Sequence, residues 1–140
     1  MIKTLNRDEA LELLTRGRIA RLGCVAEDEA YVVPVHYYFD GEYAYFHSLP
    51  GRKVDALRAH PRACLQVDEI EDVVSWRSVL AYGNYEEIGD PDERTGIVNS
   101  FMRRFPLLTP VESAVVHDGA PPRLITFRLH IDTINGVKEG

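Results

Sequence analysis

Two adjacent cations, Arg52 and Lys53, follow a Pro-Gly turn and open a segment with the apolar spacing of a helix. A helix N-terminus already carries a partial positive charge, so cations in the first turn oppose the helix dipole. A bound anion would offset this repulsion, because free backbone N–H groups, the Ser48 hydroxyl, an arginine fork and a lysine charge together suit a phosphate monoester. The alternative is a pair of solvated surface cations.

A second group of candidates lies in an apolar strand that Pro34 interrupts, with Val35, His36 and Tyr37 following it. Proline cannot donate a backbone hydrogen bond to a neighbouring strand. It therefore indicates either an edge strand or a stretch whose backbone faces a ligand. In the edge-strand interpretation, the histidine and tyrosine side chains extend outward at the rim of a barrel.

The only tryptophan, Trp76, precedes Arg77, Ser78 and Val79 near the start of a long apolar strand. Tryptophan most often indicates packing in a core or an interface. The Trp-Arg pair could equally border a planar ligand, through stacking and charge. Gly83, further along the same strand, predicts a bulge or a close approach of another backbone.

Motifs for several other chemistries are missing. The five histidines lie far apart without the spacing of zinc ligands, so we expect no metal. No GxGxxG or GxxxxGK[ST] motif occurs, and no GxSxG motif with a plausible triad order. These observations argue against conventional hydrolase, Rossmann and P-loop proteins. Cys24 and Cys64 lie among apolar neighbours and are interpreted as buried thiols, not a disulfide, which fits a reducing compartment.

Composition and charge narrow the class of partner. The chain has 140 residues, enough for a single domain over 1–140, and a net charge of −6 with both signs in both halves. An acidic chain without a basic stripe argues against nucleic acid and against an acidic membrane surface. Residues 1–8 become charged before an apolar segment can form, so we expect no secretory signal and a cytoplasmic location. The longest apolar run, 31–39, is too short to span a membrane.

The pattern of apolar residues, caps and turns predicts the elements that position these candidates. Three helices are expected at 6–17, at 51–59 and after the cap Asp90. Six strands are expected at 18–26, 30–39, 42–48, 62–68, 73–88 and 124–134, with a possible short strand at 114–117. Asp40-Gly41 is a hairpin signal. Short turns between strands predict a mainly β fold, an antiparallel barrel with two or three peripheral helices.

Several of these motifs follow one another in a specific order: GRIARLG at 17–23, YVVPV at 31–35, Asp40-Gly41, YFHS at 45–48, GRK at 51–53, His60-Pro61, WRSV at 76–79 and Gly83. This order resembles the pyridoxamine 5′-phosphate oxidase-like FMN-binding split barrels. Among them it is most similar to the branch containing the nitroimidazole-resistance reductases. The resemblance covers residues 5–88, and 127–136 is similar to the last strand of that branch.

The resemblance implies a six-stranded split β-barrel that forms a homodimer, with one FMN in each of two grooves between the subunits. By position, Arg52 and Lys53, helped by Ser48, would hold the FMN phosphate. His47 would lie near the ribityl chain or the ring. The isoalloxazine ring would lie along Pro34, Val35, His36 and Tyr37. The strand that completes the groove, from either subunit, would contribute Trp76, Arg77, Ser78 and Val79.

Two departures from the family pattern bear on the reaction. True pyridoxamine phosphate oxidases have a glutamine where Ser78 falls, and an arginine-containing C-terminal signature that 136–140 lacks. We therefore do not expect pyridoxamine phosphate as the substrate. Relatives of this fold also bind haem or a deazaflavin, so the fold alone leaves the cofactor open.

The residues and the resemblance together lead to three alternative hypotheses about function. The first is an FMN-dependent reductase that passes hydride from a nicotinamide donor to a small acceptor such as a nitroaromatic or a quinone. The second is a flavin- or haem-binding module without turnover, and the third is a dimer without a cofactor. A flavin reductase needs no covalent nucleophile, and the candidates for delivering a proton are His47 and Tyr37.

Overall fold

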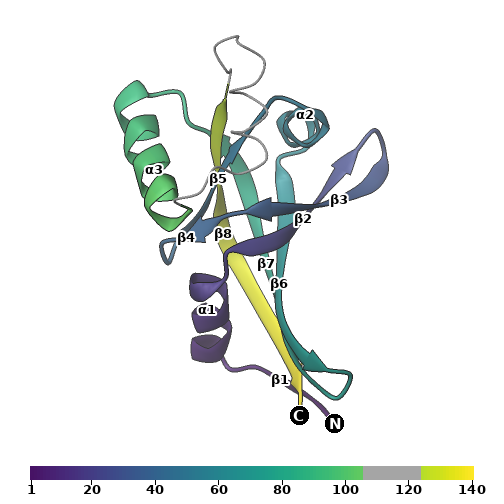
Figure 1. The fold of residues 1–140 in the computed structure, drawn as a ribbon. Coiled ribbons are helices and arrows are strands. Elements are labelled where there is room, and N and C mark those ends of the chain that lie inside the picture. The colour runs from purple at the N-terminus through teal and green to yellow at the C-terminus, as the bar shows by residue number, and fades with distance from the viewer. Residues whose placement is uncertain (106–123) are drawn as a thin grey trace.

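The computed structural model describes residues 1–105 and 124–140, so the possible strand at 114–117 lies outside the described residues. The three predicted helices are confirmed as α1 (Arg7–Arg16), α2 (Arg52–Ala59) and α3 (Pro91–Arg104). The strands are β1 (Ile2–Thr4), β2 (Ile19–Ala26), β3 (Glu29–His36), β4 (Tyr38–Phe39), β5 (Tyr43–Ser48), β6 (Arg62–Asp72), β7 (Ser75–Glu87) and β8 (Ile125–Glu139). Figure 1 shows their arrangement.

All strand pairs in the described residues are antiparallel, as predicted, but the expected closed six-stranded barrel is not found. The structure has an eight-stranded sheet in the order β3-β2-β6-β7-β8-β5-β4, with β1 paired to β8. The predicted strand 30–39 divides at Tyr37 because its two parts hydrogen-bond to different neighbours, β3 to β2 and β4 to β5. The two ends of the strand order are therefore consecutive in the chain.

The strand β8 is longer than predicted because β1 and β7 both continue to pair with it beyond residue 134. The pairing with β7 shifts register between Tyr82 and Gly83, and a Cβ at Gly83 would lie 2.5 Å from the His130 carbonyl oxygen. The predicted bulge and close approach at Gly83 are thus both confirmed. The hairpin signal is confirmed as well, since Gly41 lies between β4 and β5 with a φ of +104°.

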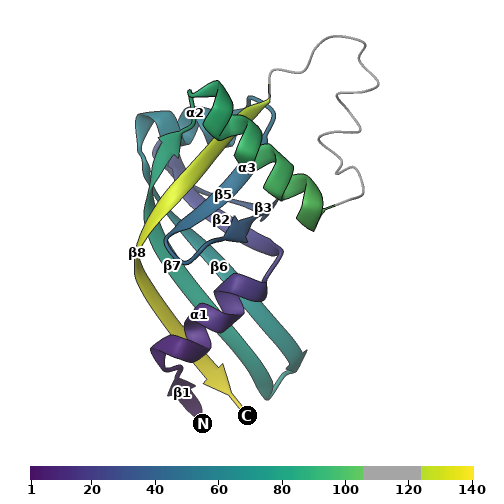
Figure 2. The same ribbon diagram turned by 90° about the vertical axis from the view of Figure 1, so that its left-hand side faces the viewer.

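The main core lies between the inner face of the sheet and helices α1 and α2. Figure 2 shows α1 lying across the lower part of the sheet. Asn6 caps α1 in a reciprocal capping box with Glu9, and the helix buries Leu13 and Leu14. Cys24 is buried and Cys64 is half-buried, and both are free thiols, as predicted.

A second apolar cluster holds α3 against the outer face of the sheet. Ile97 and Phe101 of α3 pack there with Tyr38 and Ile88. Asp90 caps the helix through the backbone N–H of Glu93. Helix α3 therefore forms a layer of its own, separate from the main core. No helix in the described part of the chain is long and apolar enough to cross a membrane.

The end of α1 gives the first prediction. A Cβ at Gly17 would clash with the Tyr37 hydroxyl and lie 2.8 Å from Val67. The Gly17→Ala variant should lower the free energy of unfolding by about 1–3 kcal/mol, because the surrounding core is fully packed. Urea unfolding measures this change.

Gly96→Ala is the matched control, since a Cβ there meets no atom within 4 Å. Alanine in the middle of α3 should raise stability by about 0.5–1 kcal/mol. Equal changes in the two variants would contradict the packing at Gly17.

Candidate functional site

Helix α2 begins without a cap. Gly51 precedes it, and no side chain hydrogen-bonds to its first turn, whereas α1 and α3 are capped by Asn6 and Asp90. The free backbone N–H groups of α2 are therefore available to an anion. The hydroxyl of Ser48, which is 2% exposed, donates to the Leu49 carbonyl oxygen at 2.8 Å.

Lys53 adds a positive charge to this helix end. Its side chain is half-buried, and burial lowers the pKa of its ammonium below the ordinary value. No hydrogen bond or ion pair joins it to any of the described residues. A partly desolvated charge without a partner costs free energy, and a bound anion would remove that cost. The residues present thus fit a phosphate group.

Arg52 is exposed and only loosely held. Its guanidinium lies 3.9 Å from the Glu29 carboxylate and 5.0 Å from the centre of the Tyr31 ring. Both contacts are with the beginning of β3, so Arg52 extends from α2 toward the first residues of that strand. An exposed ion pair at this distance contributes little stability, which leaves the guanidinium available to a phosphate.

The segment 34–37, predicted to lie along the flavin ring, is exposed at its first residue and buried at its last. Pro34 is exposed in β3, which ends the strand order, so its edge position is confirmed, but Tyr37 does not extend outward as the edge-strand interpretation expected. Val35 is half-buried against the main core, and the His36 ring lies 4.9 Å from that of Phe105. Tyr37 is completely buried, and its hydroxyl donates to the Leu14 carbonyl oxygen at 2.6 Å.

The environment of Tyr37 argues against a role in proton delivery. Burial raises the pKa of its hydroxyl far above the ordinary value. That hydroxyl already has an acceptor in the core. Of the two candidates for a proton donor, this leaves His47.

His47 and Ser48 are neighbours in the chain that point to opposite faces of β5. His47 pairs in register with Thr126 of β8 and lies under α3, with its ring 6.1 Å from that of Phe101. Together with residues of α3 and β8, it lines a cavity of about 500 Å³. Ser48 faces the interior beside the start of α2.

The group Trp76, Arg77, Ser78 and Val79 lies at the other end of the molecule (Figure 1). Ser48 pairs with the first residue of β8, and Trp76 pairs with Glu139 near its end. The 15 residues of β8 extend over up to roughly 45 Å. A single chain therefore does not bring this group to Arg52 and Lys53.

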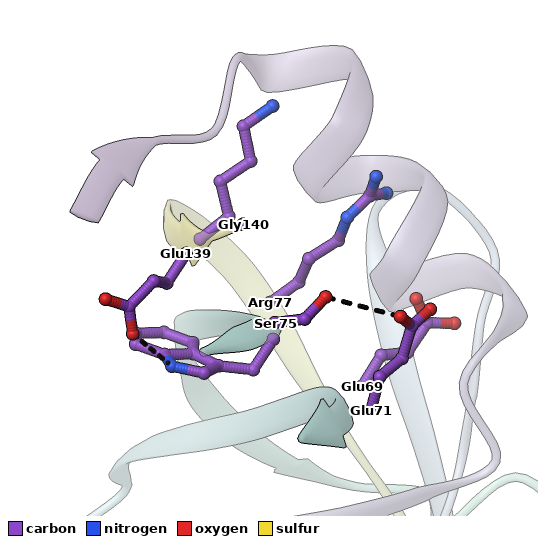
Figure 3. Close-up of a pocket in the computed structure, with 8 residues that line it drawn as sticks. Glu69, Glu71, Ser75, Arg77, Glu139 and Gly140 are labelled. Carbon is purple, nitrogen blue, oxygen red and sulfur yellow. Dashed lines mark hydrogen bonds between the residues drawn. The ribbon is translucent and has the colours of Figure 1, made fainter. Parts of the chain in front are cut away.

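Figure 3 shows the surroundings of this distant group, around a cavity of about 200 Å³. The indole N–H of Trp76 donates to Glu139 at 3.0 Å, and Arg77 is exposed beside it. Ser78 accepts a hydrogen bond from Gln66 at 3.0 Å. Val79 is completely buried in the core and cannot contact a ligand through its side chain.

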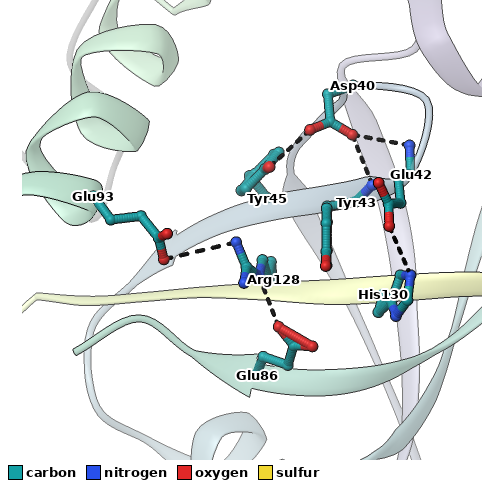
Figure 4. Close-up of polar contacts among 8 residues, drawn as sticks. All are labelled: Asp40, Glu42, Tyr43, Tyr45, Glu86, Glu93, Arg128 and His130. Atoms are coloured by element: carbon teal, nitrogen blue, oxygen red, sulfur yellow. Dashed lines mark hydrogen bonds and ion pairs between the residues drawn. The ribbon is translucent and has the colours of Figure 1, made fainter. Parts of the chain in front are cut away.

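A polar network on the outer face of β5 and β8 was not predicted (Figure 4). Arg128 lies 2.8 Å from Glu86 and 3.7 Å from Glu93 of α3, with its guanidinium 4.2 Å from the centre of the Tyr43 ring. Tyr43 in turn stacks on His130 at 4.7 Å. The alternation of 124–134 could have placed Arg128 on this face, but not its partners. The described residues contain no group of side chains arranged to hold a metal ion.

Comparison with known proteins places these features in context. The profile of the family "Pyridoxamine 5'-phosphate oxidase" matches residues 6–136. The fold is similar to that of a FAD-binding protein from Mesorhizobium loti, with 29% identity, a TM-score of 0.81 and coverage of 100% of this chain and 99% of that one.

Two further proteins are similar over different lengths. A putative 5-nitroimidazole antibiotic resistance protein from Bacteroides thetaiotaomicron has a TM-score of 0.74 at 19% identity, over 99% of this chain and 89% of that one. An uncharacterized protein from Rhizobium meliloti is 34% identical over 87 residues, which are 62% of this chain and 58% of that protein. The match thus spans little more than half the length of the Rhizobium meliloti protein.

Proposed function

Because this chain belongs to the pyridoxamine 5′-phosphate oxidase family, we propose that it is a flavoprotein whose FMN unit is held by its phosphate at α2. The observation that carries this proposal is Lys53, half-buried and without a partner among the described residues, beside Arg52 at an uncapped helix N-terminus. The 29% identical relative, a FAD-binding protein, supports a flavin as the class of cofactor.

The proposed site is completed by a second copy of the chain. Ser48 and Trp76 lie at opposite ends of β8, so one protomer supplies only part of the predicted groove. Exposed apolar side chains on β2, β3 and the β6–β7 hairpin favour such an assembly, among them Val32 at 65% and Val73 at 89% exposure. A homodimer would cover apolar surface and bring the two groups together.

We propose an oxidoreductase role for this site. A bound flavin supplies hydride and electron transfer between a nicotinamide donor and a small acceptor such as a nitroaromatic or a quinone. Arg52 and Lys53 hold the phosphate, and β3 offers its exposed edge at Pro34 to the ring. The His47 imidazole, on the α3 face of β5, is the remaining candidate for a group that holds or releases a proton. The alternative is a flavin- or haem-binding module without turnover.

Removal of the arginine tests the phosphate site. Arg52→Ala should weaken FMN binding by about ten- to a hundredfold, or ~1.5–3 kcal/mol, because a charge-assisted contact to the phosphate is lost. Fluorescence titration measures the affinity. Arg58→Ala, in the last turn of the same helix and paired with Glu87, should leave FMN binding unchanged. Equal affinity in wild type and Arg52→Ala would exclude this assignment.

Subunit complementation tests the shared groove. Arg52→Ala and Arg77→Ala should each weaken flavin binding when present in both subunits. A mixed dimer of the two variants has one site with both substitutions and one with neither, so one site should regain the wild-type affinity. Normal flavin binding by Arg77→Ala, or no recovery in the mixed dimer, would contradict a site built by two chains.

Anaerobic reduction separates the reductase from the binding module. NADH or NADPH should bleach the visible absorbance of the bound flavin, and reoxidation by a nitroaromatic or a quinone should restore it. Bleaching by dithionite but by neither nicotinamide would favour the module. A Soret band in the freshly purified protein would instead indicate haem.

A further inference from the structure

A cavity of about 500 Å³ lies between α3 and the adjoining ends of β5 and β8. This volume falls within the range of about 300–1,000 Å³ that is typical of small-molecule sites. His47 lines the cavity from β5, whereas Ser48 beside the start of α2 faces the other side of that strand. The cavity is therefore separate from the proposed phosphate site.

Two polar side chains of the lining lie toward the same end of the cavity. Glu93, in the first turn of α3, is 3.7 Å from Arg128 of β8, and this ion pair holds the beginning of the helix over the strand (Figure 4). Thr126 lies two residues before Arg128, and residues two apart share a face of a strand. Arg94, which follows Glu93, and Thr126 both line the cavity. A guanidinium and a hydroxyl are thus available near the first turns of α3.

Neither of these donors has an acceptor among the described residues. Thr126 is 1% exposed, and its buried hydroxyl makes no hydrogen bond there. The Arg94 guanidinium makes no hydrogen bond or ion pair within the described part of the chain. A buried hydroxyl without a partner lowers stability, and an acceptor on a ligand would remove that cost. This end of the cavity therefore favours a ligand group with acceptor oxygens.

The charge of the lining favours a carboxylate as that group. Arg94 is a permanent cation, and none of the described lining residues is acidic, although the whole chain has a net charge of −6. A guanidinium binds a carboxylate through two parallel hydrogen bonds. A phosphate monoester carries about two negative charges. It is better matched by the two cations and the uncapped N-terminus of α2.

The rest of the cavity suits an apolar and flat body. Val98 and Met102 follow Arg94 at intervals of four residues, so the three side chains form one stripe along α3. Leu124, just before β8, lines the cavity from the side of the sheet. A methionine thioether makes favourable contacts with aromatic rings. An aromatic ring next to a carboxylate thus matches both parts of the lining.

We propose that this cavity binds an aromatic carboxylic acid in its ionised form. Arg94 binds the carboxylate in a bidentate manner, and the Thr126 hydroxyl donates to one of its oxygens. Val98, Met102 and Leu124 cover the ring. The site gives the protein a second small-molecule ligand, on the face of the sheet opposite α2, and it does not depend on the proposed function.

Titration calorimetry of the purified protein with 2-naphthoate, 2-naphthamide and 2-naphthyl phosphate tests this inference, since the three probes share a ring and differ in the head group. The carboxylate should bind at least about tenfold more tightly than the neutral amide, because only the carboxylate forms a charge-assisted pair with Arg94. It should also bind more tightly than the phosphate. Saturation with FMN should leave its affinity unchanged.

Two variants test the head-group contacts. Arg94→Ala should weaken 2-naphthoate about tenfold and leave 2-naphthamide unchanged. Thr126→Val, with nearly the same side-chain volume, should weaken 2-naphthoate about three- to fivefold. The melting temperature of the free Thr126→Val protein should not fall, because the substitution removes a buried hydroxyl without a partner.

Arg103→Ala is the matched control on the same helix, because Arg103 contacts Ser100 and does not line the cavity. It should change none of the three affinities. Because the Arg94 side chain is exposed, Arg94→Ala should fold normally and decides the matter if Thr126→Val does not fold.

No detectable binding of 2-naphthoate, or equal affinities for it and for the amide, would overturn this inference. So would unchanged affinity for 2-naphthoate in Arg94→Ala, or tighter binding of the phosphate than of the carboxylate. Displacement of 2-naphthoate by FMN would place the probe in the flavin site and overturn the inference as well. Failure of the protein to bind a flavin would overturn the proposed function and leave this second site intact.

Discussion

The pairing of β8 with three other strands is the constraint on which the rest of the structure depends. Its first part pairs with β5, its last part with β1, and almost its whole length with β7. This ladder fixes the distance between the proposed phosphate site at one end and Trp76 at the other. It also sets the close approach at Gly83, where only a residue without a side chain fits against His130. In the proposed assembly, the length of this one strand is the reason why a second subunit completes the groove.

Electrostatics distinguish α2 from the other two helices. Helices α1 and α3 have capping side chains and acidic residues in their first turns, which satisfy the free N–H groups and the dipole. Helix α2 has Gly51 at its cap and opens with Arg52 and Lys53. The protein thus leaves uncompensated positive potential at one helix end only, among the described helices. The unpaired charges at this helix end lower the stability of the free protein. An anion that binds there would therefore raise the stability of the folded state.

The outer layer formed by α3 leaves a cavity on the face of the sheet opposite the main core. Ile97 and Phe101 hold one part of the helix to the sheet, and the pairing of Arg128 with Glu93 holds its beginning. Between these contacts the helix leaves a cavity over His47 and Thr126. One strand, β5, therefore lines this cavity with His47 on its outer face and buries Ser48 on its inner face. This alternation is a direct consequence of the period of two in a β-strand.

The sequence by itself determined the features that depend on local chemistry. The three helices, the caps Asn6 and Asp90, the turn at Asp40-Gly41 and the cations at the start of α2 follow from residues within a few positions of one another. Tertiary structure alone decided the division of the strand at Tyr37, the burial of that side chain, the pairing of β1 with β8 and the separation of Trp76 from Arg52. Each of these depends on contacts between residues far apart in the chain. A local pattern predicts that a residue is in a strand, but only the register with distant strands decides which neighbours it meets.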